Sequence, residues 1–527
     1  MVVRGLETTR KALAAAVAST TLCVALVSPM AQAQETTAEV RGVVVNSTGT
    51  PLEGATIIVT SKSTGISKTV EANANGGYSV RGLPAGVVYD VEVTADGLQK
   101  SMTKDVSLTV GQSAVLNYNL STVEEVLVTG TQVVVAQTAV GPNAIFDIAA
   151  LQDSPSVNRN INDIIQQDPR LYVDQSRGDI DAVQCNGANP RYNSLTVDGV
   201  RLNDGFGLNS NGYPTQRMPF PYDAISSVAV EMAPMSVVYG GFSACNINAV
   251  TKTGRNEIYG SAFFDYGSDQ LRGDKLEGDS IAQQDYSETR YGFELGGALI
   301  QDKLFFYGAY EKYDGADLNN RGAIGSGAVN EVPVTQAELD RIAQIARDVY
   351  GYEPGRTVSE AFDFDDEKYL VKLDWYASDS QRLSMTYMHN DSFNFTPSDG
   401  DLDEFEFDKH FYKRGAELTT YNINWYADWS DNFSTEVRYS YSEVDFLQAS
   451  VSGLDFAEFR IELDEVDVYL GQDDSRQAND LDWEVEQLVA RGTYTFGDHS
   501  ITFGYERDSS DIFNLFYQHV DTEIRFD

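Results

Sequence analysis

The sequence has few residues of the types that most metal sites and nucleophilic enzymes use. Only three residues are cysteine and only four are histidine: His389, His410, His499 and His519. Zinc sites draw heavily on Cys and His, and a Cys–His catalytic pair needs both. Because no histidine precedes His389, we expect neither kind of site in the first 388 residues. We also find no phosphate-binding glycine loop. We therefore expect no catalytic residues, no metal ligands and no cofactor.

Positive charge is also scarce. Lys and Arg number 38 against 79 Asp and Glu, which gives a formal net charge of −41. Binding to nucleic acid or to an anionic inner-membrane surface needs a basic face, so neither is an expected partner. The chain is nevertheless 42% apolar, with 29 Tyr and 25 Phe but only 14 Pro. This composition favours strands with one polar and one apolar face over disorder.

The first 33 residues have the pattern of a secretory signal peptide. Three basic residues within the first 11 positions precede an uncharged, largely apolar stretch at 12–27. Ala31-Gln32-Ala33 is a cleavage site that would leave Gln34 as the first mature residue. The alternative is a membrane anchor, for which about 16 apolar residues are short. No later stretch approaches the length of a spanning helix, so we expect a periplasmic protein, a secreted protein or an outer-membrane barrel.

Residues 39–120 are predicted to form a small β-sandwich, because short β-prone runs alternate with turns rich in Gly, Asn and Pro. The run at 54–56, the step at 77–80 and the turn at 83–86 resemble the carboxypeptidase-regulatory-like domain. This resemblance implies a transthyretin-like, carbohydrate-binding-like fold. Because the domain has no histidine to bind zinc, we expect a non-catalytic spacer or docking module.

A short, β-prone segment with polar flanks follows the predicted sandwich. It comprises Glu124, Glu125, Val126, Leu127, Val128, Thr129 and Gly130. Such a segment can add as an edge strand to the sheet of a partner; the alternative is a simple linker strand. It resembles the TonB box, which we place at residues 123–131. The resemblance implies that TonB and its inner-membrane motor proteins are partners.

Residues 140–254 resemble the plug of TonB-dependent outer-membrane receptors, an α+β domain that fills a barrel. A short helix at 161–165 precedes a strand and turn at 195–200, and a second run at 224–231 leads to the end of the plug. The positions that match the plug motif are Asp198, Gly199, Val200, Tyr239, Gly240, Asn246, Ile247, Asn248, Val250, Thr251 and Lys252.

Two cysteines, Cys185 and Cys245, remain after removal of the signal peptide, and both fall inside the predicted plug. The compartment is oxidising, so we predict a disulfide between them. Such a bond would stabilise the domain by on the order of 4 kcal/mol through loop entropy. The alternative is two unpaired buried thiols.

Residues 256–527 show mainly period-two alternation, with one apolar face and one polar face that would line a wet lumen. Tight turns at 300–303, 377–381, 428–432 and 496–499 alternate strictly with long segments along about nine strands. Long segments are expected at 268–287, 314–367, 392–418 and 447–484. Short turns at one end and long loops at the other are typical of outer-membrane barrels. The stretch Tyr291–Tyr313 resembles the first hairpin of the Oar-like subfamily.

The resemblance implies an antiparallel transmembrane barrel of about 22 strands, of which about nine fit here. A partial barrel would leave open edges in lipid. We therefore expect the sequence to be the N-terminal part of a longer protein.

The predicted external loops are acidic at 363–367, 399–408 and 464–474. The stretch at 399–410 fails as an EF-hand, because its sixth position is Glu404 and its twelfth is His410. Weak binding of divalent cations by solvated loops is the remaining interpretation. Residues 335–350 carry Leu339, Ile342, Ile345 and Val349 at helical spacing, which predicts a loop helix packed on the barrel rim.

Together these features predict a mainly β protein of the outer membrane of a Gram-negative bacterium, with its N-terminal domain in the periplasm. The resemblance implies a receptor that imports a scarce extracellular ligand, such as a metal chelate, an oligosaccharide or a peptide. The acidic loops weakly favour a cationic or metal-containing ligand. The alternative is a receptor without transport or a structural or adhesive surface protein.

Overall fold

The structure is a computed structural model. It describes residues 35–111, 113–122, 143–154, 156, 159–174, 182–206, 209, 211–234, 236–273, 275–276, 278–280, 285–317, 321–357, 361–397, 403–453, 456–497, 499–520 and 523–526. The predicted signal peptide at 1–33 and the predicted coupling segment at 124–130 lie outside these residues. Within the described part, no helix is long and apolar enough to cross a membrane.

The N-terminal domain is the predicted β-sandwich. Its strands are β1 (Thr37–Asn46), β2 (Thr56–Ser61), β3 (Ser67–Glu71), β4 (Gly77–Pro84), β5 (Val87–Thr94), β6 (Ser101–Leu108), β7 (Ser113–Val115) and β8 (Tyr118–Leu120). One sheet joins β4, β1, β7 and β8, and the other has the order β3-β2-β5-β6. Alternate residues of β5, including Tyr89 and Val91, are buried between the sheets. Period-two alternation thus supplies the core of the domain.

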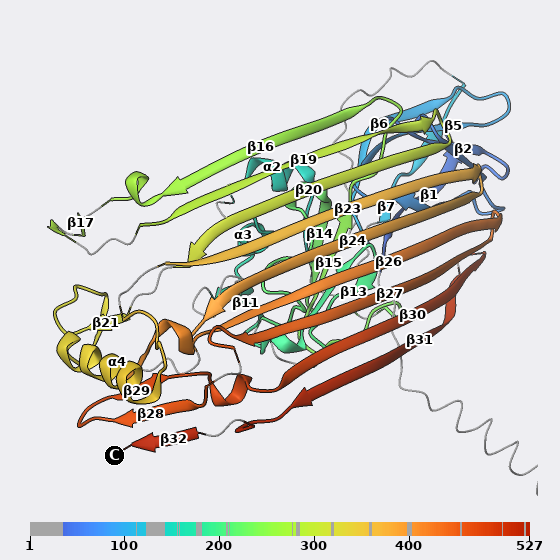
Figure 1. The fold of residues 1–527 in the computed structure, drawn as a ribbon. Coiled ribbons are helices and arrows are strands. Elements are labelled where there is room, and N and C mark those ends of the chain that lie inside the picture. Colours follow the sequence, from blue (N-terminus) through green and yellow to red (C-terminus); the bar gives the residue numbers. More distant parts are fainter. Residues whose placement is uncertain are drawn as a thin grey trace, which may run out of the picture.

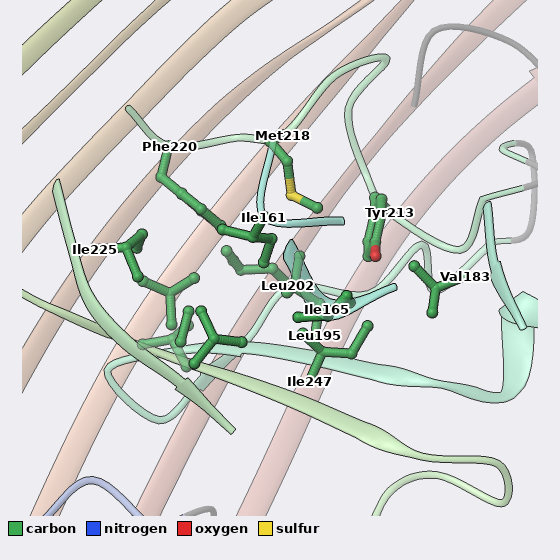
Figure 2. Close-up of a cluster of buried hydrophobic side chains, with 14 of the residues drawn as sticks. Ile161, Ile165, Val183, Leu195, Leu202, Tyr213, Met218, Phe220, Ile225 and Ile247 are labelled. Atoms are coloured by element: carbon green, nitrogen blue, oxygen red, sulfur yellow. The ribbon is translucent and has the colours of Figure 1, made fainter. Parts of the chain in front are cut away.

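The predicted plug is a second unit with its own mixed sheet. Its elements are β9 (Asn143–Phe146), α2 (Ile148–Asp153), α3 (Asn162–Ile165), β10 (Leu171–Asp174), β11 (Ala182–Cys185), η1 (Pro190–Tyr192), β12 (Ser194–Val197), β13 (Val200–Arg201), η2 (Tyr222–Ala224), β14 (Ile225–Glu231) and β15 (Asn246–Thr251). The sheet order is β13-β12-β15-β14-β9. Ile161 and Ile165 pack against Leu195 and Ile247 of this sheet in a closed apolar core (Figure 2).

The predicted disulfide between Cys185 and Cys245 is confirmed. It joins the end of β11 to the residue before β15 across a sequence separation of 60 residues. Both cysteines are buried in the core of the plug. The bond therefore ties the β10–β11 hairpin to the central strand of the plug sheet.

Nine long antiparallel strands form a curved wall around the plug (Figure 1). They are β16 (Tyr259–Ser268), β19 (Ser287–Ile300), β20 (Leu304–Asp317), β23 (Phe362–Ser378), β24 (Gln381–Thr396), β26 (Tyr412–Ser430), β27 (Phe433–Ser450), β30 (Asn479–Phe496) and β31 (His499–Phe516). The four predicted tight turns are all present. The strands run further than expected, so the intervening segments, such as residues 397–411 and 451–478, are shorter than predicted.

The two ends of the wall differ. We call the end with the tight turns the short-turn end and the opposite end the long-loop end. The N-terminal domain lies at the short-turn end (Figure 1), where Lys68 forms an ion pair of 2.6 Å with Asp428 of the wall. The N-terminal domain therefore lies at one end of the wall, and the long segments that connect the strands lie at the other end.

Much of the outer face of the wall is apolar. Exposed side chains on it include Phe293, Leu295, Val371, Trp375, Ile423, Trp425, Leu488, Phe503 and Tyr505. Soluble monomers rarely expose so large a contiguous apolar surface, whereas the outer face of a membrane barrel must meet lipid. The inner face is not simply a wet lumen, because Tyr307, Leu370 and Trp483 pack against the core of the plug.

Carboxylates lie opposite one another on the outer face near the long-loop end. The directly paired residues are Glu367 with Asp391, Asp391 with Glu417, Glu417 with Asp445, and Asp445 with Asp482. Like charges in such register destabilise a sheet. The acidic run at 363–367, predicted to lie in a loop, is instead part of β23. The described wall thus concentrates part of the negative charge of the chain at this end.

The connecting segments at the long-loop end fold into a small cap. Its elements are β21 (Arg321–Ala323), β22 (Asn330–Val332), α4 (Gln336–Tyr350), β25 (Glu404–Glu406), η4 (Asp408–His410), β28 (Glu458–Glu462), β29 (Asp467–Leu470), η5 (Asp474–Arg476) and β32 (Glu523–Phe526). The segment with η3 (Asp269–Leu271), β17 (Lys275–Leu276) and β18 (Asp279–Ser280) lies apart from the cap (Figure 1), and among the described strands β17 and β18 pair only with each other. Helix α4 packs on β28 and β29 and not on the barrel rim as predicted. Leu339 and Ile342 are buried there, but Ile345 and Val349 are exposed, so only half of the predicted apolar face is buried.

Replacing Cys185 and Cys245 together with Ser is expected to destabilise the plug by about 2–4 kcal/mol, because the unfolded chain gains the freedom of the opened loop. Denaturant unfolding of the plug, with a thiol count on the non-reduced protein, measures this. Two free thiols in the native protein, or an unchanged midpoint, would contradict the structural role of the bond.

Candidate functional site

The motif residues Asp198 and Gly199 form the turn between β12 and β13. Their φ angles are 47° and 82°, and Val197 pairs with Val200 on either side. Two successive residues with positive φ suit a tight two-residue hairpin turn, and glycine adopts such a φ without steric cost. The turn lies against the wall, where it meets the inward-facing side chains of four strands.

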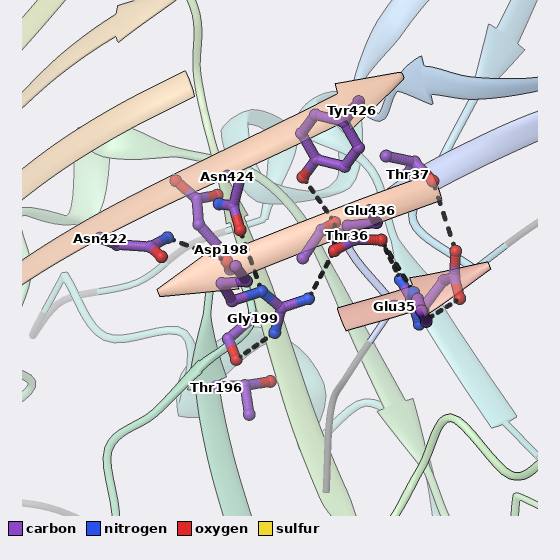
Figure 3. Close-up of polar contacts among 12 residues, drawn as sticks. Glu35, Thr36, Thr37, Thr196, Asp198, Gly199, Asn422, Asn424, Tyr426 and Glu436 are labelled. Carbon is purple, nitrogen blue, oxygen red and sulfur yellow. Dashed lines mark hydrogen bonds and ion pairs between the residues drawn. The ribbon is translucent and has the colours of Figure 1, made fainter. Parts of the chain in front are cut away.

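The carboxylate of Asp198 is buried and fully partnered. Thr251 donates to it from its backbone nitrogen (2.9 Å) and its hydroxyl (2.6 Å), and Lys372 of β23 donates from Nζ at 3.0 Å. Asn422 of β26 donates to the backbone carbonyl of Asp198 at 3.2 Å (Figure 3). Burial raises the pKa of Asp198, but Lys372 and the Thr251 hydrogen bonds outweigh it and hold the pKa below its usual value. Asp198 therefore stays charged.

Arg438 of β27 holds the other half of the turn. Its side chain is only 1% exposed, and its Nη1 donates to the carbonyl of Gly199 at 2.6 Å. The same guanidinium donates to Asn424 Oδ1 at 3.0 Å and to Glu436 at 2.8 Å. Glu436 also accepts from Nε of Arg491 at 2.8 Å. A connected set of polar contacts therefore leads from the plug turn across three strands of the wall, β26, β27 and β30.

A second buried ion pair lies at the end of the plug. Nζ of Lys252 contacts the two oxygens of Glu294 in β19 at 2.9 and 2.8 Å, and Tyr307 donates to the same carboxylate at 2.6 Å. We call the contacts of Asp198 with Lys372, Gly199 with Arg438, and Lys252 with Glu294 the polar seam. The polar seam fixes both ends of the motif to the wall.

Two further motif residues, Tyr239 and Asn246, surround the buried carboxyl group of Glu231. Burial raises the pKa of Glu231 to about 7, while hydrogen bonds from Tyr239 and Asn246 oppose the rise and Glu35 adds to it. Glu231 and Tyr239 line a cavity of about 340 Å³ between the N-terminal domain, the plug and the wall. This junction is where the three parts of the chain meet.

The remaining motif residues support the strand that carries the site. Ile247 belongs to the core of the plug, Val250 packs against the N-terminal domain, and Asn248 accepts a hydrogen bond of 3.0 Å from Thr196. Gly240 follows Tyr239 in the loop before β15. The sequence did not identify the partners in the wall. The alternating pattern placed Lys372, Glu436 and Arg438 on the polar, inward-facing side of their strands. It gave no other indication that these residues belong to the site.

Metal-ligating spacing occurs at one place among the described residues. Carboxylate oxygens of Glu458, Asp473 and Asp474 at the long-loop end lie within 4.8 Å of one another. Asp473 and Asp474 belong to the acidic run expected at 464–474. These residues are separate from the polar seam.

Three family models match successive parts of the chain. The Carboxypeptidase regulatory-like domain matches residues 39–121, and the TonB-dependent Receptor Plug Domain matches residues 135–245. The Outer membrane beta barrel domain matches residues 250–527, which is more than half of the chain. The order of the three matches is the order of the three structural units described above.

A curated relative and a solved structure agree with these matches. The TonB-dependent transporter Oar of Myxococcus xanthus is 24% identical over 276 residues, covering 49% of this chain and 25% of the relative. The outer membrane transporter YddB from Escherichia coli has a TM-score of 0.52 at 11% identity, covering 71% of this chain and 48% of that one. The chain thus spans about a quarter of the Oar sequence and about half of the YddB structure, and the YddB likeness concerns the fold alone.

Replacing Gly199 with Ala should loosen the plug in the barrel. A Cβ at this position would lie 2.1 Å from Nη1 of Arg438 and would occupy a φ of +82°. Gly187→Ala is the matched control, because Gly187 has a φ of +77° and open space around it. We expect Gly199→Ala to cost about 1–3 kcal/mol more than the control in plug unfolding by denaturant. Equal losses in the two variants would show that the contact with Arg438 carries no energy.

The stability of the plug should also depend on pH through Glu231. Its pKa is raised from 4.5 to about 7, so the folded plug holds the proton more tightly than the unfolded chain. The contribution is therefore fully present below about pH 4.5 and is lost as the pH rises through about 7, at roughly 1.4 kcal/mol per unit of pKa shift. Denaturant midpoints from pH 4.5 to 8 should fall for the wild type and fall less for Glu231→Gln. Parallel curves for the two proteins would contradict this assignment.

Proposed function

The chain belongs to the TonB-dependent outer-membrane receptors, and on this premise we propose that the complete protein imports a scarce ligand across the outer membrane. The long-loop end faces the outside and the short-turn end faces the periplasm, as in other barrels of this membrane. The ligand binds above the plug. TonB and its motor proteins pull on Glu124–Gly130, and the plug then rearranges to let the ligand pass.

The polar seam is the observation that carries this proposal. Buried ion pairs cost desolvation energy that roughly offsets their attraction, so they fix a geometry without adding much net stability. Once water enters the interface, Lys372 and Arg438 can be solvated, and they meet the same partners when the plug returns. A purely apolar interface offers no such defined position. The polar seam therefore suits a gate that is closed specifically and opened repeatedly.

The coupling segment has the chemistry that a strand-adding motif needs. Residues 124–130 are rich in Val and end at a glycine, and they directly precede the plug in sequence. Main-chain hydrogen bonds to an edge strand of TonB would transmit force along the chain with little dependence on side chains. Force applied there reaches the plug first at β9, an edge strand whose one partner among the described strands is β14.

The ligand class stays open between a metal chelate, an oligosaccharide and a peptide. The carboxylates near the long-loop end, including Asp391, Glu417 and Asp445, favour the approach of a cationic or metal-containing ligand. The electrostatic attraction of these carboxylates raises the rate at which the ligand meets the protein, but it does not define a binding site.

The alternative is a receptor or surface protein that does not transport. One feature favours it: the cap at the long-loop end has its own apolar core and exposes Ile345 (43%) and Val349 (68%) on α4. Exposed apolar side chains on a packed element suit contact with another protein. Such a protein would bind its partner without depending on TonB.

Deleting residues 124–130 should abolish uptake while leaving surface binding unchanged. The matched control deletes residues 132–138, which shortens the same linker by seven residues and leaves residues 123–131 intact. Cells carrying each version are compared for binding and uptake of labelled ferric chelates, oligosaccharides and peptides. Uptake that survives the first deletion, or that is lost equally in the control, would contradict the coupling role.

A further inference from the structure

The first described residues of the chain lie between the plug and the wall (Figure 3). The backbone carbonyl of Glu35 accepts a hydrogen bond of 2.7 Å from Asn248 in β15 of the plug. The hydroxyl of Thr36 bonds Tyr426 of β26 at 2.8 Å and donates to Glu436 of β27 at 3.5 Å. Thr36 and Thr37 are only 6% and 7% exposed. We call Glu35–Thr37 the strap.

The strap is linked to the same charges that hold the plug turn. The carboxylate of Glu35 pairs with Arg491 at 3.5 Å, and Arg491 in turn pairs with Glu436. Glu436 contacts Arg438, whose Nη1 binds the carbonyl of Gly199. The polar contacts therefore run without a break from the start of the N-terminal domain to the turn of the plug.

The N-terminal domain also contacts the plug and the wall directly. Ala85 and Val110 of the domain pack with Ala229 and Val250 of the plug. A Cβ built on Gly86 would lie 2.6 Å from the hydroxyl oxygen of Ser226, so the two backbones approach closely there. A movement of the domain away from the wall must consequently pull on the strap.

We propose that the strap is a second coupling element, in which Glu35 and Thr36 position the Arg491–Glu436–Arg438 contacts and so hold the plug turn closed. This inference rests on the proposed function and adds to it. The periplasmic domain, together with the segment at 124–130, then sets how readily the plug moves. A partner that draws the domain away from the short-turn end would loosen the gate, and one that presses it there would hold the gate shut.

The position of the strap in the chain suits this role. The apolar core of the N-terminal domain begins at Ala38, so the strap is not part of that core. Cleavage after Ala33, as the sequence predicts, makes Glu35 the second residue of the mature protein. A chain end can withdraw from an interface without any other segment having to unfold. Substitutions in the strap should therefore leave the domain folded.

The first test measures how often the plug opens. The complete protein is inserted in planar bilayers, and single-channel conductance is recorded for wild type, Glu35→Ala/Thr36→Val and the control Lys100→Gln. Lys100 is matched as a charged residue of the same domain whose ion pair, with Glu92 at 3.2 Å, lies outside the strap. We expect the strap variant to open about tenfold more often, which corresponds to about 1.4 kcal/mol. Opening at the wild-type rate, with the domain still resistant to protease, would overturn the proposal.

The second test closes the strap chemically. In Thr36→Cys/Tyr426→Cys, a short bis-methanethiosulfonate reagent links the two new thiols, while Cys185 and Cys245 are already bonded to each other. Linking should reduce the opening frequency below that of the wild type, and cleavage of the link should restore it. An opening frequency that linking does not change would overturn the proposal. These recordings need neither TonB nor ligand, so they are independent of the deletion of residues 124–130.

Discussion

Burying the charged carboxylate of Asp198 costs on the order of several kcal/mol unless a cation and hydrogen-bond donors meet it. Thr251 supplies donors from within the plug, but the cation, Lys372, comes from the wall. The plug can therefore satisfy this group in one position only. The contact between Asp198 and Lys372 forms only when three conditions are met. The turn at Asp198 and Gly199 must be left-handed, β12 must pair with β15 in the observed register, and Lys372 must lie on the inward-facing side of β23.

The rest of the interface follows from the same constraint. Arg438 fixes the turn from a second strand, and Lys252 fixes the end of β15 through Glu294. Apolar packing continues the interface around Tyr307 and Leu370. The disulfide between Cys185 and Cys245 makes β11 and β15 move together. The plug is thus stiff in its centre, and β9, which follows the coupling segment, is an edge strand of its sheet.

The sequence was informative where a local pattern determines the structure. Alternation and turn residues predicted the β-sandwich, and the strict order of short and long connections predicted the nine-stranded wall. The compartment and the two remaining cysteines predicted the disulfide. Each of these inferences needs only neighbours in sequence or a count of residues.

The same local patterns do not predict contacts between residues that lie far apart in the sequence. Period two places Lys372 and Arg438 on the inner face but does not say which plug residue they meet, because that depends on how the plug is rotated in the wall. The strands extend into the segments expected to be long loops, because the backbones of polar residues such as Asp365 and Glu367 pair across strands just as those of apolar residues do. Helix α4 was predicted correctly as a helix, but Ile345 and Val349 were assigned to the wrong environment, since the spacing does not show how wide the covered face is.

The most direct test of the account is a double-mutant cycle on Asp198→Asn and Lys372→Met. The free energy of plug unfolding in the barrel is measured for the wild type, the two single variants and the double variant. If the pair holds the plug in place, the two losses are not additive, and the coupling energy is about 1–3 kcal/mol. Losses that add to within about 0.5 kcal/mol would contradict the claim that this buried pair fixes the plug.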